Sequence, residues 1–80
     1  MLDETRLKQV IASVLQVPVE SIGDDTSRET IERWDSLQHM NLVLALEDEF
    51  GIYIPDEDAT RINSYPLIMQ VVNEQLARAS

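Results

Sequence analysis

Apolar residues recur at helical spacing in three separate segments of this chain. In residues 3–16 the repeat consists of Leu7, Val10, Ile11, Val14 and Leu15. From about Ser64 onward it consists of Tyr65, Ile68, Met69, Val72 and Leu76. The third repeat, in residues 35–50, is apolar over more than half of the helix circumference. Because apolar residues three and four positions apart share one helix face, the pattern predicts an all-α fold.

The breaks between these segments indicate where the helices end. Pro18 stops the first helix, Gly51 suits the end of the second, and Pro55 keeps the residue before it extended. A short helix over residues 56–62 would carry acids at its N-terminal end. We therefore expect a small up-and-down bundle of three longer helices and one short helix, with residues 17–34 as a long first loop. The loop residues expected to be buried are Val19, Ile22, Ile31 and Trp34.

The composition restricts the possible functions. The 80 residues include 15 Asp and Glu against 6 Lys and Arg, a formal charge of −9 that disfavours nucleic acid and anionic membrane and favours basic protein surfaces as partners. With no Cys and one His, disulfides and most zinc sites are excluded. The acidic stretch at residues 48–58 fails the calcium-loop pattern. If Gly51 takes the glycine position of such a loop, which is its sixth, Leu46 falls at the first ligand position. We expect one free-standing domain over residues 1–80 that starts at its own Met1, monomeric, cytoplasmic and without membrane insertion.

A serine stands where the long loop meets the second helix. Asp35 is a good N-cap residue and Gln38, three positions later, completes a pattern like a capping box, which places Ser36 in the first turn. A phosphate ester on Ser36 would lie at the positive end of the helix dipole. A serine in a first turn often satisfies only local hydrogen bonds, so both interpretations are open at this point.

The second helix is more apolar than a single packing contact requires. Its narrow polar face consists of Gln38, Asn41, Ala45, Asp48 and Glu49, and the opposite side consists of Leu42, Val43, Leu46 and Phe50. Leu37, Met40 and Leu44 widen the apolar arc toward the Ser36 end. We interpret these three as partner contacts, with ordinary core packing as the alternative.

Three stretches together resemble the acyl carrier proteins. They are residues 34–37 (Trp-Asp-Ser-Leu), residues 42–52 (Leu-Val-Leu-Ala-Leu-Glu-Asp-Glu-Phe-Gly-Ile) and residues 54–59 (Ile-Pro-Asp-Glu-Asp-Ala). The resemblance implies a carrier and not an enzyme, with 4′-phosphopantetheine from coenzyme A attached to Ser36 by a phosphopantetheinyl transferase. The thiol of that arm would hold the cargo as a thioester. Acyl-loading and acyl-transferring enzymes with basic patches would bind the second helix. The residues implied in partner binding are Asp35, Leu37, Met40, Leu44, Glu47, Asp48, Asp56 and Glu57.

Some residues depart from the common pattern of the family. Gln38 and Asn41 stand where carriers of fatty acid synthesis tend to have acids. Trp34 directly before residues 35–37 resembles the pattern of D-alanyl carriers and of stand-alone carriers of dedicated biosynthetic pathways. A specialised biosynthetic role is expected, with an aminoacyl, D-alanyl or peptidyl carrier as the alternative. An unmodified helical interaction module is a further alternative. A hydrolase built on Ser36 and His39 is disfavoured, because one helical turn has no separate wall to provide an oxyanion hole.

Overall fold

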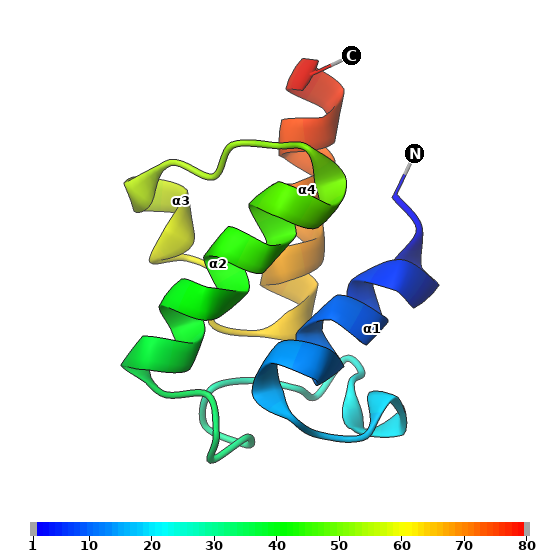
Figure 1. Ribbon diagram of the computed structural model, residues 1–80, viewed down its shortest axis with the longest axis vertical. Helices are drawn as coiled ribbons and strands as arrows, with labels where there is room; N and C mark the ends of the chain where they lie inside the picture. Colours follow the sequence, from blue (N-terminus) through cyan, green and yellow to red (C-terminus); the bar gives the residue numbers. More distant parts are fainter. Residues whose placement is uncertain (1, 80) are drawn as a thin grey trace.

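The structure is a computed structural model that describes residues 2–79. Its elements are α1 (Glu4–Leu15), the short 3₁₀ helix η1 (Val19–Ser21), α2 (Ser36–Phe50), α3 (Asp56–Ala59) and α4 (Tyr65–Ala79). In Figure 1, α1 runs toward the end of the molecule where the long loop lies, whereas α2 and α4 run away from it and residues 51–64 return between them. The predicted all-α bundle with one short helix is therefore confirmed.

Local capping explains where the first two long helices begin and end. The Asp3 carboxylate accepts from the Arg6 amide at the start of α1, and Gln16 ends that helix in the left-handed conformation with φ 58°. Asp35 caps α2, and Gly51 ends it with φ 63°, a value that favours glycine. Each observed boundary lies within one residue of the predicted one.

The core lies between α1, α2 and α4. Its fully buried apolar residues lie on α1, α2 and α4 and in the turn after α3: they are Leu7, Ile11, Leu15, Leu42, Leu46, Ile62, Tyr65, Ile68, Val71 and Val72. The sequence interpretation left out Val71, and it also left out Gln75, a buried polar residue of α4. Two predicted core residues of α4, Met69 and Leu76, are only partly buried and pack against the edge of the core.

The long loop crosses one end of the bundle, as expected (Figure 1). Ile22 and Trp34 are buried and Ile31 is partly buried, but the expectation for Val19 was wrong, because η1 leaves its side chain 37% exposed. Polar contacts also pin the loop. The buried Thr26 hydroxyl accepts from the Gly23 amide and donates to a carbonyl of η1, and the Thr26 carbonyl accepts from the Tyr65 amide at the start of α4.

The third helix is shorter than predicted. Residues 56–62 were expected to be helical, but α3 ends at Ala59, and Ile62 is fully buried in the turn that follows. The end of α3 is fixed by side chains from two other helices. The His39 imidazole of α2 contacts the carbonyl oxygen of Ala59 at 2.7 Å, and the Gln75 amide of α4 donates to Asp58 over 3.2 Å. Both contacts join residues that are far apart in the sequence, so a local sequence pattern could not predict them.

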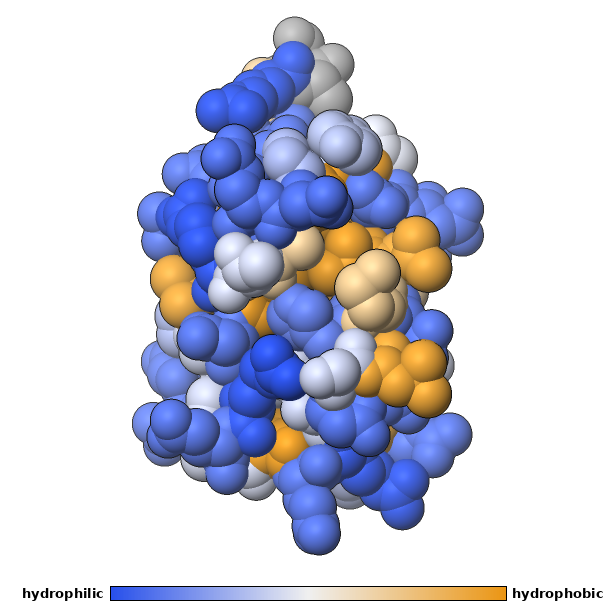
Figure 2. Space-filling view, turned by 90° about the vertical axis from the view of Figure 1, so that its left-hand side faces the viewer, coloured by the Kyte–Doolittle hydropathy of each residue, from blue (hydrophilic) through white to orange (hydrophobic). Residues whose placement is uncertain are grey.

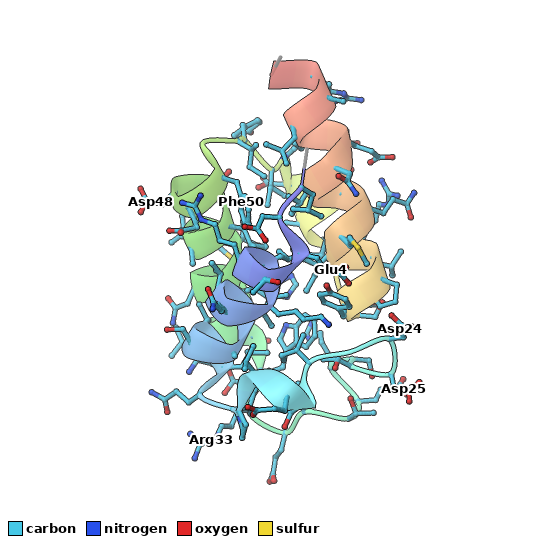
Figure 3. The ribbon with its side chains drawn as sticks, turned by 90° about the vertical axis from the view of Figure 1, so that its right-hand side faces the viewer. Glu4, Asp24, Asp25, Arg33, Asp48 and Phe50 are labelled. Atoms are coloured by element: carbon cyan, nitrogen blue, oxygen red, sulfur yellow. The ribbon has the colours of Figure 1, made fainter. Side chains whose placement is uncertain are left out.

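Tyr65 lies fully buried at the start of α4. Its hydroxyl donates to the Glu4 carboxylate over 3.0 Å, and the Lys8 ammonium nitrogen lies 5.6 Å from the ring centroid. Figure 3 shows Glu4 between α1 and α4. Burial of the phenol, and then the hydrogen bond to Glu4, raise the pKa of Tyr65 above its usual value.

We expect Tyr65 to make the fold sensitive to alkaline pH. The native pKa is raised, so the unfolded chain loses the phenolic proton first. The contribution of the protonated Tyr65 to the stability of the fold is therefore complete below about pH 10. It is lost as the pH rises toward the native pKa of Tyr65. The melting temperature of Tyr65→Phe should fall less between about pH 9 and pH 11 than that of the wild type. Tyr53→Phe, at a ring that is 70% exposed, is the control and should follow the wild type. Equal slopes for Tyr65→Phe and wild type would contradict this.

Candidate functional site

Ser36 is the first residue of α2, and its side chain is exposed. The residue before it does the capping: Asp35 Oδ1 accepts from the Gln38 amide over 2.9 Å. Within residues 2–79 the Ser36 hydroxyl makes no hydrogen bond to protein. The hydroxyl is thus available for chemistry without any loss to the fold.

The first turn of α2 suits a phosphodiester. The His39 amide donates to the carbonyl of Asp35 over 2.8 Å, and the Gln38 amide is taken by the Asp35 side chain. The amides of Ser36 and Leu37 have no protein acceptor within the described part of the chain. Unpaired amides at the start of a 15-residue helix give an electropositive environment to an anion on the serine oxygen.

Three apolar side chains of α2 next to Ser36 are exposed to solvent. Leu37 is 71% exposed, Met40 57% and Leu44 58%, whereas Leu42, Val43 and Leu46 of the same helix are buried. The alternative that the first three are ordinary core is therefore wrong. We name Leu37, Met40 and Leu44 the apolar stripe; Figure 2 shows apolar side chains gathered over α2 on this side of the molecule.

The acidic candidates divide into two groups. Asp35, Asp48, Asp56 and Glu57 are exposed, and Figure 3 shows Asp48 on α2, far from Asp24 and Asp25 of the long loop. Glu47 differs, because it is partly buried and its Oε2 accepts from the Ile54 amide over 2.8 Å. Glu47 therefore holds the connector after α2 in place, a structural role that the sequence interpretation did not anticipate.

The polar face beside Ser36 carries amides that bind each other. Asn41 Nδ2 donates to Gln38 Oε1 over 3.1 Å. The second half of the predicted capping box, from the Gln38 side chain back to the Asp35 amide, is accordingly absent from the described residues. This part of the helix surface therefore presents two uncharged residues next to the exposed serine.

His39 has a role that the sequence interpretation missed. Its Nδ1 accepts from Trp34 Nε1 over 3.1 Å and its Nε2 lies 2.7 Å from the Ala59 carbonyl oxygen, which requires the tautomer with the proton on Nε2. The Trp34 and His39 rings also stack, with centroids 6.2 Å apart. The two residues occupy the N′ and N4 positions around the Asp35 cap, where a staple contact is common, so this signal was present in the sequence.

This arrangement does not form a nucleophile and base. Both imidazole nitrogens of His39 are used by the fold, and neither contacts the Ser36 hydroxyl.

Within residues 2–79 there is no group of three or more His, Cys, Asp or Glu placed to hold a metal ion. No helix in that part of the chain is both long and apolar enough to span a membrane.

Comparisons with known proteins agree with this geometry. A family model described as the phosphopantetheine attachment site matches residues 5–73. The acyl carrier protein of Thermosynechococcus vestitus is 32% identical over 72 residues, which cover 90% of this chain and 89% of that protein.

Two solved structures share the fold. The holo acyl carrier protein of Geobacter metallireducens has a TM-score of 0.82 and 27% identity, and the match covers 92% of this chain and 85% of that one. The hexanoyl carrier protein of the actinorhodin polyketide synthase of Streptomyces coelicolor has a TM-score of 0.83 over 100% of this chain and 96% of its own. At 24% identity, the second match supports the fold alone.

Proposed function

Because this chain belongs to the acyl carrier protein family, we propose that Ser36 carries its covalently attached 4′-phosphopantetheine. Proteins of this family are carriers and not enzymes, and they interact with a phosphopantetheinyl transferase and with other enzymes. In this proposal the thiol of the arm holds an acyl intermediate as a thioester, and a monomer of the protein presents it to successive enzymes.

One observation carries the assignment of Ser36. Ser36 is an exposed serine at the first position of a long helix, and the residue before it, Asp35, supplies the cap. The Ser36 hydroxyl is therefore not needed to stabilise the helix. By contrast, the Ser64 hydroxyl accepts from the Leu67 amide at the start of α4. The start of α2 therefore combines an available oxygen with a favourable field for the phosphodiester.

The proposed partner surface is the apolar stripe with the exposed acids around it. Leu37, Met40 and Leu44 would fill an apolar notch. The cap Asp35, Asp48 of α2, and Asp56 and Glu57 of α3 would face Arg and Lys of the enzyme. Glu47 is less suited to this role, because the Ile54 amide already engages its carboxylate. The apolar contacts would supply affinity, and the acids would steer the encounter.

We further propose a specialised biosynthetic pathway rather than central fatty acid synthesis. The support is the pair Gln38 and Asn41, which bind each other and leave this part of the polar face uncharged. An enzyme that reads acids at these positions would meet two amides. Such an enzyme should associate more slowly with this carrier than with a more acidic one.

Added negative charge beside Ser36 should improve loading by enzymes of fatty acid synthesis. Gln38→Asp combined with Asn41→Glu adds two charges beside Ser36 and alters no buried residue. Loading by an acyltransferase of fatty acid synthesis should rise several-fold at low salt, mainly through the association rate, because an exposed charge contributes about 0.2–1 kcal/mol. The gain should shrink in high salt. Asp48→Lys is the control and should lower loading. No gain at low salt would assign the selectivity to the shape of the apolar stripe.

The cargo itself tests the pathway. The protein is isolated from its own cells, and the group bound to the arm as a thioester is identified by mass spectrometry. A single acyl or aminoacyl group outside fatty acid synthesis supports a specialised carrier. A ladder of fatty acyl chains that differ by two carbons would place the protein in central fatty acid synthesis and would overturn that part of the proposal.

A further inference from the structure

Trp34 and His39, which contact each other, flank the proposed attachment site in the sequence. Trp34 lies two residues before Ser36 and His39 three residues after it. The Trp34 side chain is only 2% exposed and belongs to the core, whereas Ser36 is exposed. The hydrogen bond from Trp34 Nε1 to His39 Nδ1, 3.1 Å long, therefore joins the last loop residue before the cap to the first turn of α2.

The remaining nitrogen of His39 extends the link to α3. Nε2 donates to the Ala59 carbonyl, which is the last carbonyl of α3. A single imidazole thus connects the loop, α2 and α3. Together with the Asp35 cap, the contact between Trp34 and His39 fixes the direction of the loop as it enters α2.

We propose that His39 is a positioning residue for the phosphopantetheinylation of Ser36, acting through Trp34. The inference rests on the proposed function of Ser36. In that reaction the Ser36 hydroxyl gives its proton to a base of the transferase. Its oxygen forms a bond to the phosphorus that bears pantetheine, the phosphoanhydride bond of coenzyme A breaks, and adenosine 3′,5′-bisphosphate leaves. The serine oxygen must lie in line with the bond that breaks, so the angle at which the loop enters α2 affects the rate.

The alternative is that His39 only stabilises the fold, and the chain offers a control for it. Gln75 of α4 also holds α3, through its hydrogen bond to Asp58, but it does not touch the loop before Ser36. His39→Phe keeps an aromatic ring against Trp34 and removes both nitrogens. Gln75→Leu releases α3 and leaves the contact of Trp34 with His39 intact. Both variants leave the apolar stripe unchanged and both loosen α3, so any change in KM that comes from Asp56 and Glu57 should be shared by the two.

The experiment measures kcat and KM for transfer from coenzyme A by a phosphopantetheinyl transferase at a temperature where each variant is folded. His39→Phe should lower kcat about tenfold or more with little change in KM, because misplacement of a reacting atom costs rate rather than binding. Gln75→Leu should keep a kcat near that of the wild type. His39→Gln, whose amide offers both an acceptor and a donor, should recover part of the loss.

The opposite contact provides a second variant if His39→Phe does not fold. Trp34→Phe removes the indole donor, and it should also lower kcat; in the double variant with His39→Phe the two losses should not add, because they break one contact. A loss in His39→Phe no larger than in Gln75→Leu, or additive losses in the double variant, would overturn the inference. Failure of the wild type to be modified on Ser36 would overturn the proposed function and with it this inference, so the two failures are distinguishable.

Discussion

Replacing Ser36 by alanine should abolish the addition of phosphopantetheine completely. The side chain is exposed and forms no hydrogen bond within the described residues, and Asp35 continues to cap α2. We therefore expect the free energy of unfolding to change by less than about 0.5 kcal/mol. Intact mass after coexpression with a phosphopantetheinyl transferase measures the modification, and denaturant unfolding measures the stability.

Ser13→Ala is the matched control for this prediction. Ser13 is an exposed serine in the last turn of α1, away from a helix start. That variant should gain the same mass as the wild type. Modification of Ser36→Ala at the wild-type level would show that another residue accepts the arm, whereas a large loss of stability would show that the hydroxyl supports the fold.

The largest effect on stability should come from Leu46→Ala. Leu46 is fully buried in the core, so its truncation should cost about 2–5 kcal/mol. A small domain has a total stability of about 5–15 kcal/mol, so this loss removes a large fraction of it and should lower the melting temperature by about 10 °C or more. The melting temperature and the denaturant midpoint measure this loss.

Leu44→Ala is the matched variant two residues away on the same helix. Leu44 is 58% exposed, so the substitution should cost well under 1 kcal/mol of stability. It should instead raise the KM of an enzyme that binds the apolar stripe. If Leu44→Ala destabilised the protein as strongly as Leu46→Ala, the apolar stripe would be part of the core. If it changed neither stability nor KM, the stripe would not be a partner surface.

The parts of the fold that depend on local chemistry could be predicted from the sequence. The boundaries of α1 and α2 follow from Asp3 and Asp35 as caps and from Gly51, which adopts the left-handed conformation. The buried faces follow from helical periodicity. The exposure of Leu37 and Met40 was also predicted, because the apolar arc of α2 is wider than one packing contact needs.

The parts that depend on long-range contacts could not be predicted. α3 is a single turn whose end is set by His39 and Gln75, which lie 20 and 17 residues away from their contacts. Likewise, Glu47 reads as a surface acid, and only the path of the connector shows that its carboxylate accepts from the Ile54 amide. At the candidate site, the position of Ser36 in the first turn and the capping of α2 by Asp35 are confirmed, while the modification of Ser36 stays a prediction.

Localising the modification tests whether Ser36 carries the phosphopantetheine arm. The purified protein is incubated with coenzyme A and a phosphopantetheinyl transferase, digested, and its peptides are fragmented in a mass spectrometer. We expect that one phosphopantetheine group is added and that it resides on Ser36. A protein that gains no mass, or that gains it on a different serine, would show that Ser36 does not carry the arm.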